Sequence, residues 1–197
     1  MNSEMLMSGK MSAKVKRAPT APLSWKLSNL PNLVKGFWKE SIASLFGLPA
    51  FFGHLYVRVI KKDGEIVNYG LVSNRVVTTA FVNEMVDQLQ TETSTWGDFK
   101  YHDSGVGTTG AVVGDTDIET TDGESRVTGS QEEGASANIY KSIGTIGYTT
   151  TKAITEHGLF NASTSGILLD RHVFSAINVD NGDSIQFTYE LTCTAGG

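Results

Sequence analysis

Three glycines supply the most familiar motif in this sequence. Gly105, Gly107 and Gly110 give a literal G-x-G-x-x-G, which in dinucleotide-binding proteins cradles a pyrophosphate between a strand and the start of a helix. That chemistry needs a buried strand before the motif and a helix after it. Residues 100–104 are mostly polar and Gly114 follows soon after, so neither flank fits and we predict no nucleotide site.

Acidic residues alternate just beyond those glycines. Asp115, Asp117 and Glu119 resemble the start of a calcium-binding loop. An EF-hand loop needs Gly at position six and Glu at position twelve, and the sequence has Thr120 and Arg126 there. An irregular calcium site remains open beside the simpler interpretation, a solvated acidic loop.

Histidines and the single cysteine do not form a recognisable metal or catalytic motif. No two histidines are three to five residues apart and Cys193 is alone, which disfavours zinc and rules out an internal disulfide. His157 adjoins Glu156 and His172 lies near Asp170, but only a specific fold could make these pairs an acid and a base. We therefore predict no catalytic residues, no metal and no cofactor. We expect His157 and His172 each to be a hydrogen-bonded polar residue near a strand end. The four histidines are His54, His102, His157 and His172.

Charge divides the chain into two parts. Residues 1–50 hold seven basic and two acidic side chains, a net +5, and the whole chain is −5, so residues 51–197 carry −10. All four prolines also fall in the first part. This division predicts an extended N-terminal arm, 1–50, joined to an acidic domain, 51–197. The acidic domain argues against nucleic acid as a ligand.

No segment of the sequence predicts a membrane or secretory role. No run reaches the roughly 18 apolar residues that a spanning helix needs, and residues 1–17 are polar where a signal peptide would be apolar. We expect the protein to be made in a cytosol-like compartment and to stay there until assembly, without a membrane partner.

The arm contains one helical pattern. Residues 1–20 have few large apolar groups, and Pro19 and Pro22 favour extended backbone, with Trp25 as an anchor before Pro31. From about 32 to 46 the pattern becomes amphipathic, beginning at a suitable N-cap, Asn32. The apolar positions recur three and four residues apart: Leu33, Val34, Phe37, Trp38, Ile42, Leu45 and Phe46.

Three roles are open for this helix. It could cover the β domain of its own chain, as most amphipathic helices do. It could bind a groove on another subunit, because the prolines and the basic charge are typical of a linker. It could also lie on a membrane surface, although it has only two lysines on a short polar face.

Residues 51–197 have the pattern of a β-rich domain. Two alternating runs, 54–61 and 65–72, flank an Asp-Gly turn, which predicts a hairpin. Residues 78–90 predict a helix, with apolar positions four apart. The clearest strand is the last, in which alternate residues share one face: Ile185, Phe187, Tyr189, Leu191 and Cys193. Several further short strands predict a mainly β fold, a jelly-roll-like antiparallel β-sandwich with one or two helices.

A long polar segment interrupts this domain. Residues 105–134 are dominated by Gly, Thr, Ser, Asp and Glu. The segment is too long for a routine connection, so we expect a functional loop or one ordered by its neighbours.

Several short segments, taken together and in order, resemble a family of structural proteins of tailed bacteriophages. The resemblance covers about residues 57–197 and implies a virion component built on a β-sandwich; it does not extend to residues 1–50. The segments are 101–102 with 105–109, 115–119, 134–140, 153–160, 168–171 and 182–189.

The expected function is that of a non-enzymatic cement or decoration protein on the capsid surface, assembled in the host cytoplasm. Its partner would be the major capsid protein, and it would self-associate as a homotrimer, so that several weak arm contacts give strong attachment. The predicted partner-binding residues are large apolar groups of the arm: Trp25, Leu33, Phe37, Trp38, Ile42 and Leu45.

Two other functions remain open. The same domain could belong to the phage tail, as a connector or a fibre-proximal protein. It could instead be a carbohydrate-binding module on the virion surface that uses exposed aromatic side chains such as Trp96 and Tyr148.

Overall fold

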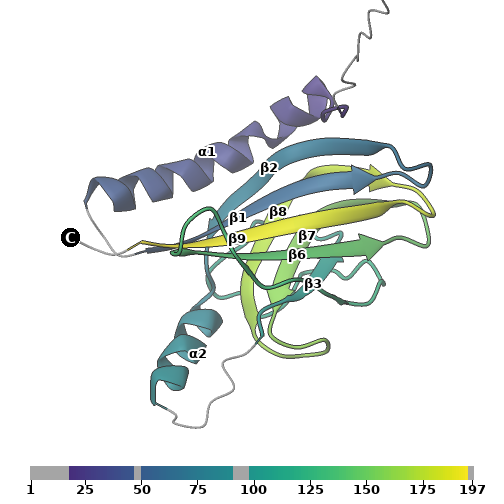
Figure 1. The fold of residues 1–197 in the computed structure, drawn as a ribbon. Helices are drawn as coiled ribbons and strands as arrows, with labels where there is room; N and C mark the ends of the chain where they lie inside the picture. The colour runs from purple at the N-terminus through teal and green to yellow at the C-terminus, as the bar shows by residue number, and fades with distance from the viewer. Residues whose placement is uncertain (1–17, 47–49, 91–97, 195–197) are drawn as a thin grey trace, which may run out of the picture.

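The computed structural model describes residues 18–46, 50–90 and 98–194, which form two antiparallel β-sheets and two helices. Figure 1 shows the sheets stacked in two layers, with one helix lying along the sandwich and the other at one end. The predicted mainly β sandwich is therefore confirmed. Its jelly-roll connectivity stays a prediction.

The larger sheet is built around the C-terminal strand. Strand β9 lies between β1 and β6, and the predicted hairpin joins β1 to β2 through Gly64, whose positive φ of 86° suits a glycine in a tight turn. Every pairing between these strands is antiparallel, and Thr20 forms an isolated parallel bridge to Asn68 of β2. In spatial order the strands are β2 (Ile66–Val76), β1 (Ala50–Ile60), β9 (Ser184–Thr194), β6 (Ile139–Gly147) and β5 (Glu132–Glu133).

The smaller sheet completes the sandwich. Its two long strands, β7 and β8, pair around a register irregularity between Ile154 and Glu156. In spatial order the strands are β4 (Val127–Thr128), β3 (Tyr101–Gly105), β7 (Lys152–Phe160) and β8 (Leu168–Val179).

The core lies between the two sheets. The alternation predicted for the last strand is confirmed for its first four apolar positions, from Ile185 to Leu191, which are buried, whereas Cys193 is only partly buried. They pack against Ile154 and Ile177 of the other sheet. Alternation of apolar side chains toward one layer is what fixes the strand register.

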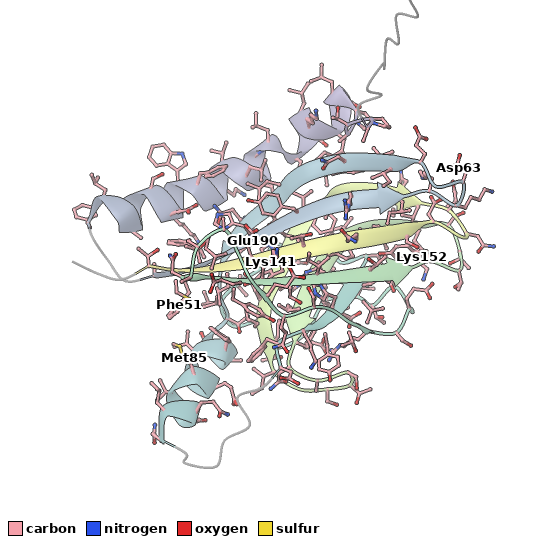
Figure 2. The ribbon with its side chains drawn as sticks, viewed as in Figure 1. Phe51, Asp63, Met85, Lys141, Lys152 and Glu190 are labelled. Atoms are coloured by element: carbon pink, nitrogen blue, oxygen red, sulfur yellow. The ribbon has the colours of Figure 1, made fainter. Side chains whose placement is uncertain are left out.

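Helix α2 (Thr79–Gln90) confirms the second predicted helix and sits at one end of the sandwich (Figure 1). Thr78 begins it as an N-cap, because its hydroxyl accepts a hydrogen bond from the Phe81 amide at 3.1 Å. Met85 lies on the side of α2 near Phe51 of β1 (Figure 2) and lines an apolar cavity of about 230 Å³ with it.

Helix α1 (Leu23–Leu45) differs from the prediction for the arm. It begins nine residues before Asn32 and continues through Pro31, so residues 23–31 are helical rather than extended. Pro31 cannot donate to the Leu27 carbonyl, but both residues are exposed, so water can satisfy that carbonyl. Residues 1–17 lie outside the described part of the chain.

Candidate functional site

Helix α1 lies across the open edges of both sheets. Strand β2 is the edge of the larger sheet and β8 the edge of the smaller one, and α1 runs beside them (Figure 1). An edge strand presents backbone N–H and C=O groups that no neighbouring strand pairs. The residues of α1 that face these edges therefore need to be polar or small.

The first turns of α1 provide such polar groups. Asn29, which is 1% exposed, donates from its amide nitrogen to the Val72 carbonyl at 2.8 Å and accepts from the Ser175 amide at 2.9 Å. The Trp25 indole donates to the carbonyl oxygens of Ser175 and Ala176, each at 3.0 Å. Trp25 thus bonds backbone carbonyls of β8, and Asn29 bonds one backbone group on each of β2 and β8.

The next turns continue the same face. Asn32 donates to the Val173 carbonyl and accepts from Arg75. Buried Gly36 lies against Asn74, and Glu40 accepts a hydrogen bond from the Asn74 amide at 2.7 Å. These residues, with Trp25 and Asn29, are spaced three and four apart and are called here the inner face of α1.

The opposite side of α1 is apolar and exposed. Trp38 is 67% exposed, Leu45 80%, and the others between 43% and 72%. Side chains project from this side away from both sheets (Figure 2). We call these nine residues the outer stripe: Leu23, Leu27, Leu30, Val34, Phe37, Trp38, Ile42, Leu45 and Phe46.

The predicted partner-binding residues divide between the two sides. Phe37, Trp38, Ile42 and Leu45 belong to the outer stripe and are available to a partner. Leu33 is half-buried. Trp25 is engaged by its own chain, through its two hydrogen bonds and an edge-on contact with the Tyr69 ring at 4.8 Å. Trp25 therefore packs within its own chain and is not one of the exposed partner-binding residues.

Helix α1 covers the β domain of its own chain, which was one of its predicted roles, but not with the side that the sequence pattern indicates. The apolar side does not cover the β domain of its own chain, because the polar and small side does. The sequence pattern did not indicate that the polar side of α1, and not its apolar side, would face the domain. The outer stripe does continue the predicted spacing backward through Leu30, Leu27 and Leu23, a signal that could have extended the helix across Pro31.

Three histidines that are far apart in sequence meet between the sheets. His102, His157 and His172 are fully buried on adjacent strands β3, β7 and β8. His102 Nδ1 lies 2.9 Å from His157 Nε2, and its Nε2 lies 2.8 Å from the Ser142 hydroxyl. The predicted position near a strand end is therefore wrong for His157 and His172, which are core residues inside β7 and β8.

This histidine cluster has the properties of a structural network. Burial lowers the pKa of His102 to about 3 and holds that of His157 well below its ordinary value, so both rings are neutral. His172 Nε2 lies 3.1 Å from an Asp170 carboxylate oxygen but outside hydrogen-bonding geometry. With side chains 0% exposed, none of these histidines can meet a substrate in this conformation.

The acidic loop is held by arginines. Arg171 contacts Glu156 at 2.7 Å, Asp115 at 3.1 Å and Glu119 at 3.2 Å. Arg126 contacts Asp117 at 3.3 Å. Among the described residues no group of three or more potential metal ligands occurs. The ion pairs thus order this loop against the smaller sheet, as expected for a loop ordered by its neighbours.

Buried Glu156 fixes the glycine-containing part of the loop. Its carboxylate accepts hydrogen bonds from the backbone amides of Gly107, Glu119 and Thr120 at 2.8–3.0 Å. Gly107 packs so closely on Glu156 that an added Cβ would lie 2.5 Å from its oxygen. Gly105 and Gly107 therefore pack around a buried carboxylate, whereas an added Cβ at Gly110 would meet nothing within 4 Å. Up to Thr194, where the described part of the chain ends, no helix follows the motif.

Of the two aromatic residues proposed to bind carbohydrate, Tyr148 is buried and cannot do so. Tyr148 is 2% exposed and its hydroxyl lies 3.0 Å from the Ser104 hydroxyl, so its ring cannot stack on a sugar. Trp96 lies outside the described residues.

No protein-family model, curated protein or solved structure matches this chain. The resemblance to phage structural proteins therefore stays a prediction. Within the described residues, neither helix is long and apolar enough to cross a membrane. The candidate site is the outer stripe of α1.

Proposed function

We propose that this chain is a non-enzymatic structural protein of a tailed-phage virion, a cement or decoration protein of the capsid surface. It attaches through the outer stripe of α1 to the shell built by the major capsid protein. The observation that carries this proposal is the exposed apolar side of a helix whose other side already binds its own domain. The resemblance of residues 57–197 to phage structural proteins supports the same conclusion.

The length of the outer stripe suits a protein surface. A helix of 23 residues is about 35 Å long, and large apolar groups occur along all of it. Contiguous exposed apolar surface of this kind marks an interaction site.

Rigid positioning would help attachment. Because the inner face holds α1 on two sheet edges, the outer stripe is already ordered before a partner arrives. A preordered helix loses less conformational entropy on binding than a flexible arm does. A homotrimer, which we propose as the assembled form, would present three such helices and multiply a weak single contact.

Attachment to purified empty shells tests this function. Substituting Phe37, Trp38 and Leu45 together by serine should weaken co-sedimentation with shells at least tenfold, since buried aromatic anchors dominate interface energies. These side chains are exposed, so the melting temperature should not fall. In the matched control, Val86 and Leu89, two exposed apolar residues of α2, are substituted by serine. This variant should attach to the shells as the wild type does.

Other outcomes separate the alternatives. Attachment of the wild-type protein to isolated tails instead of shells would favour the tail connector. Binding to lipid vesicles that depends on the same three residues would favour a membrane-surface helix. Equal attachment of the triple variant and the wild type would refute the proposed function.

A further inference from the structure

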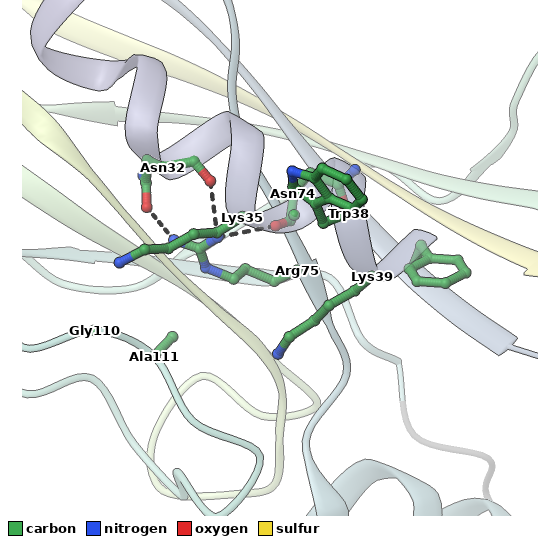
Figure 3. A pocket seen from close by; sticks show the side chains of 10 residues that line it. Asn32, Lys35, Trp38, Lys39, Asn74, Arg75, Gly110 and Ala111 are labelled. Carbon is green, nitrogen blue, oxygen red and sulfur yellow. Dashed lines mark hydrogen bonds between the residues drawn. The ribbon is translucent and has the colours of Figure 1, made fainter. Parts of the chain in front are cut away.

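A cationic pocket adjoins the outer stripe. It has a volume of about 440 Å³ and lies between α1 and the segment at Gly110 and Ala111. Figure 3 shows Lys35 and Lys39 extending from α1 on the side where Arg75 lies. The lining residues include Asn32, Lys35, Trp38, Lys39, Asn74 and Arg75.

The pocket gathers positive charge, and its wall holds no acidic side chain. Three cations line it. Lys35 and Lys39 are one helical turn apart, a spacing at which like charges repel. Within the described part of the chain, neither lysine forms an ion pair. A bound anion would relieve this repulsion.

Arg75 differs from two other arginines of this protein, partly buried Arg126 and buried Arg171. Arg126 and Arg171 each contact carboxylates. Arg75 donates only to neutral oxygens, the Asn32 and Asn74 carbonyls at 3.2 and 3.0 Å and the Asn32 side chain. Partly buried charges are usually paired. Arg75 therefore lacks an anionic partner within the described residues.

Burial and one carboxylate act on this guanidinium in opposite directions. Burial lowers the pKa of Arg75, and the negative charge of Asp170 raises it. Asp170 lines an adjoining cavity of about 250 Å³ and lies 3.3 Å from the Tyr189 hydroxyl. A neutral hydroxyl leaves the charge of Asp170 in place, so Asp170 offsets part of the Arg75 charge. It does not line the larger pocket, which has no acidic lining residue.

The surroundings favour a protein carboxylate over a nucleic-acid phosphate. Trp38 belongs both to the pocket wall and to the outer stripe, so a partner lying on the stripe reaches the pocket directly. Residues 51–197 carry a net charge of −10 and repel a polyanion, whereas one carboxylate needs only the local cations. Paired apolar and charge contacts also fix the register of a partner.

We propose that this pocket binds an Asp or Glu carboxylate of the protein that docks on the outer stripe. The inference rests on the proposed function and deepens it. The Arg75 guanidinium and the two lysines hold the carboxylate, while Trp38 packs on the neighbouring apolar surface. The contact is charge-assisted and selects partners that carry an acidic residue beside apolar ones.

Carbodiimide cross-linking of full-length protein on empty shells tests the contact, because this reagent joins a lysine amine to a carboxylate that touches it. Mass spectrometry should find Lys35 or Lys39 joined to an Asp or Glu of the shell protein. The double variant Lys35→Gln, Lys39→Gln should attach at least tenfold more weakly in low salt. Lys26→Gln, an exposed lysine of the same helix outside the pocket, should attach normally.

Attachment without these cross-links, or with no effect of the double variant, would overturn the inference while leaving the proposed function standing. If wild-type protein does not attach to shells, the proposed function fails and the pocket is tested alone. The probe is then sodium glutarate against sodium phosphate at equal ionic strength, followed by NMR. Shifts at Lys39 and Arg75 with glutarate support the inference; shifts with phosphate only, or none, overturn it.

Discussion

Gly36 of α1 and Asn74 of β2 touch with no side chain between them. A Cβ added to Gly36 would lie 2.8 Å from the Asn74 Cβ and closer still to its carbonyl oxygen, distances that Cβ atoms do not adopt. Glycine is the weakest helix former apart from proline, yet it occupies the middle of a helix here. Close approach of α1 to the sheet edge explains its presence.

The first prediction concerns this contact. Gly36→Ala should lower the free energy of unfolding by about 1–3 kcal/mol through overpacking, despite the gain of about 1 kcal/mol in helix propensity. Urea unfolding measures the difference. Gly110→Ala, where an added Cβ meets nothing within 4 Å, is the matched control. A stabilised Gly36→Ala would mean that α1 does not pack on Asn74.

The second prediction compares the two sides of α1. Asn29→Leu should cost about 2–4 kcal/mol, because the Val72 carbonyl and the Ser175 amide would lose their partner. Leu27→Asn, on the outer stripe, should change the stability by less than about 0.5 kcal/mol. Thermal and urea unfolding of both variants check this. A larger loss of stability in Leu27→Asn than in Asn29→Leu would show that the apolar side of α1 faces the domain.

The third prediction is a loss of stability in acid. Burial keeps the folded-state pKa of His102 at about 3 and that of His157 also below 6.5. The unfolded chain takes up protons below about pH 6.5 while these folded rings do not, so stability falls as the pH drops from about 6.5 toward 3. Each ring adds a slope of about 1.4 kcal/mol per pH unit.

Substitution separates this effect from general acid unfolding. His157→Gln should reduce the slope of unfolding free energy against pH, measured between pH 4.5 and 6, by about 1.4 kcal/mol per unit. Phe187→Leu, a core change beside the His157 ring, should lower stability without altering the slope. An unchanged slope in His157→Gln would mean that this ring is protonated in the folded protein.

Much of the β domain could be predicted from the sequence, because its signals are local. The Asp63-Gly64 turn sets the β1–β2 hairpin, and alternation from Ile185 to Leu191 sets the buried face of β9. The meeting of His102, His157 and His172 could not be predicted, since it depends on which strands become neighbours. Strand order is a tertiary property that a single-strand pattern does not carry.

The side of α1 that meets the domain was also beyond the sequence pattern. An apolar stripe normally indicates the buried side of a helix. Here Asn29 and Gly36 are buried instead, because the surface beneath them is two strand edges with unpaired backbone groups rather than a sheet face. The competing physical demand, satisfaction of buried polar groups, decided the orientation.

The fourth prediction concerns the acidic loop. Arg171→Met should destabilise the protein by about 3–5 kcal/mol, because buried Glu156 would lose the cation that offsets its charge. Amide hydrogen exchange at Gly107 and Thr120, which both donate to Glu156, should become faster. Arg58→Met, an exposed arginine on β1, is the control. Unchanged protection would show that the ion pair does not order the loop.

A reconstruction of the shell carrying the full-length protein tests the central claim most directly. The account predicts that Leu27, Phe37, Trp38 and Leu45 are buried against a shell subunit, while Asn29 and Gly36 remain packed on β2 and β8 of their own chain. A particle in which the outer stripe stays open to solvent would contradict it. So would one in which α1 leaves its own domain.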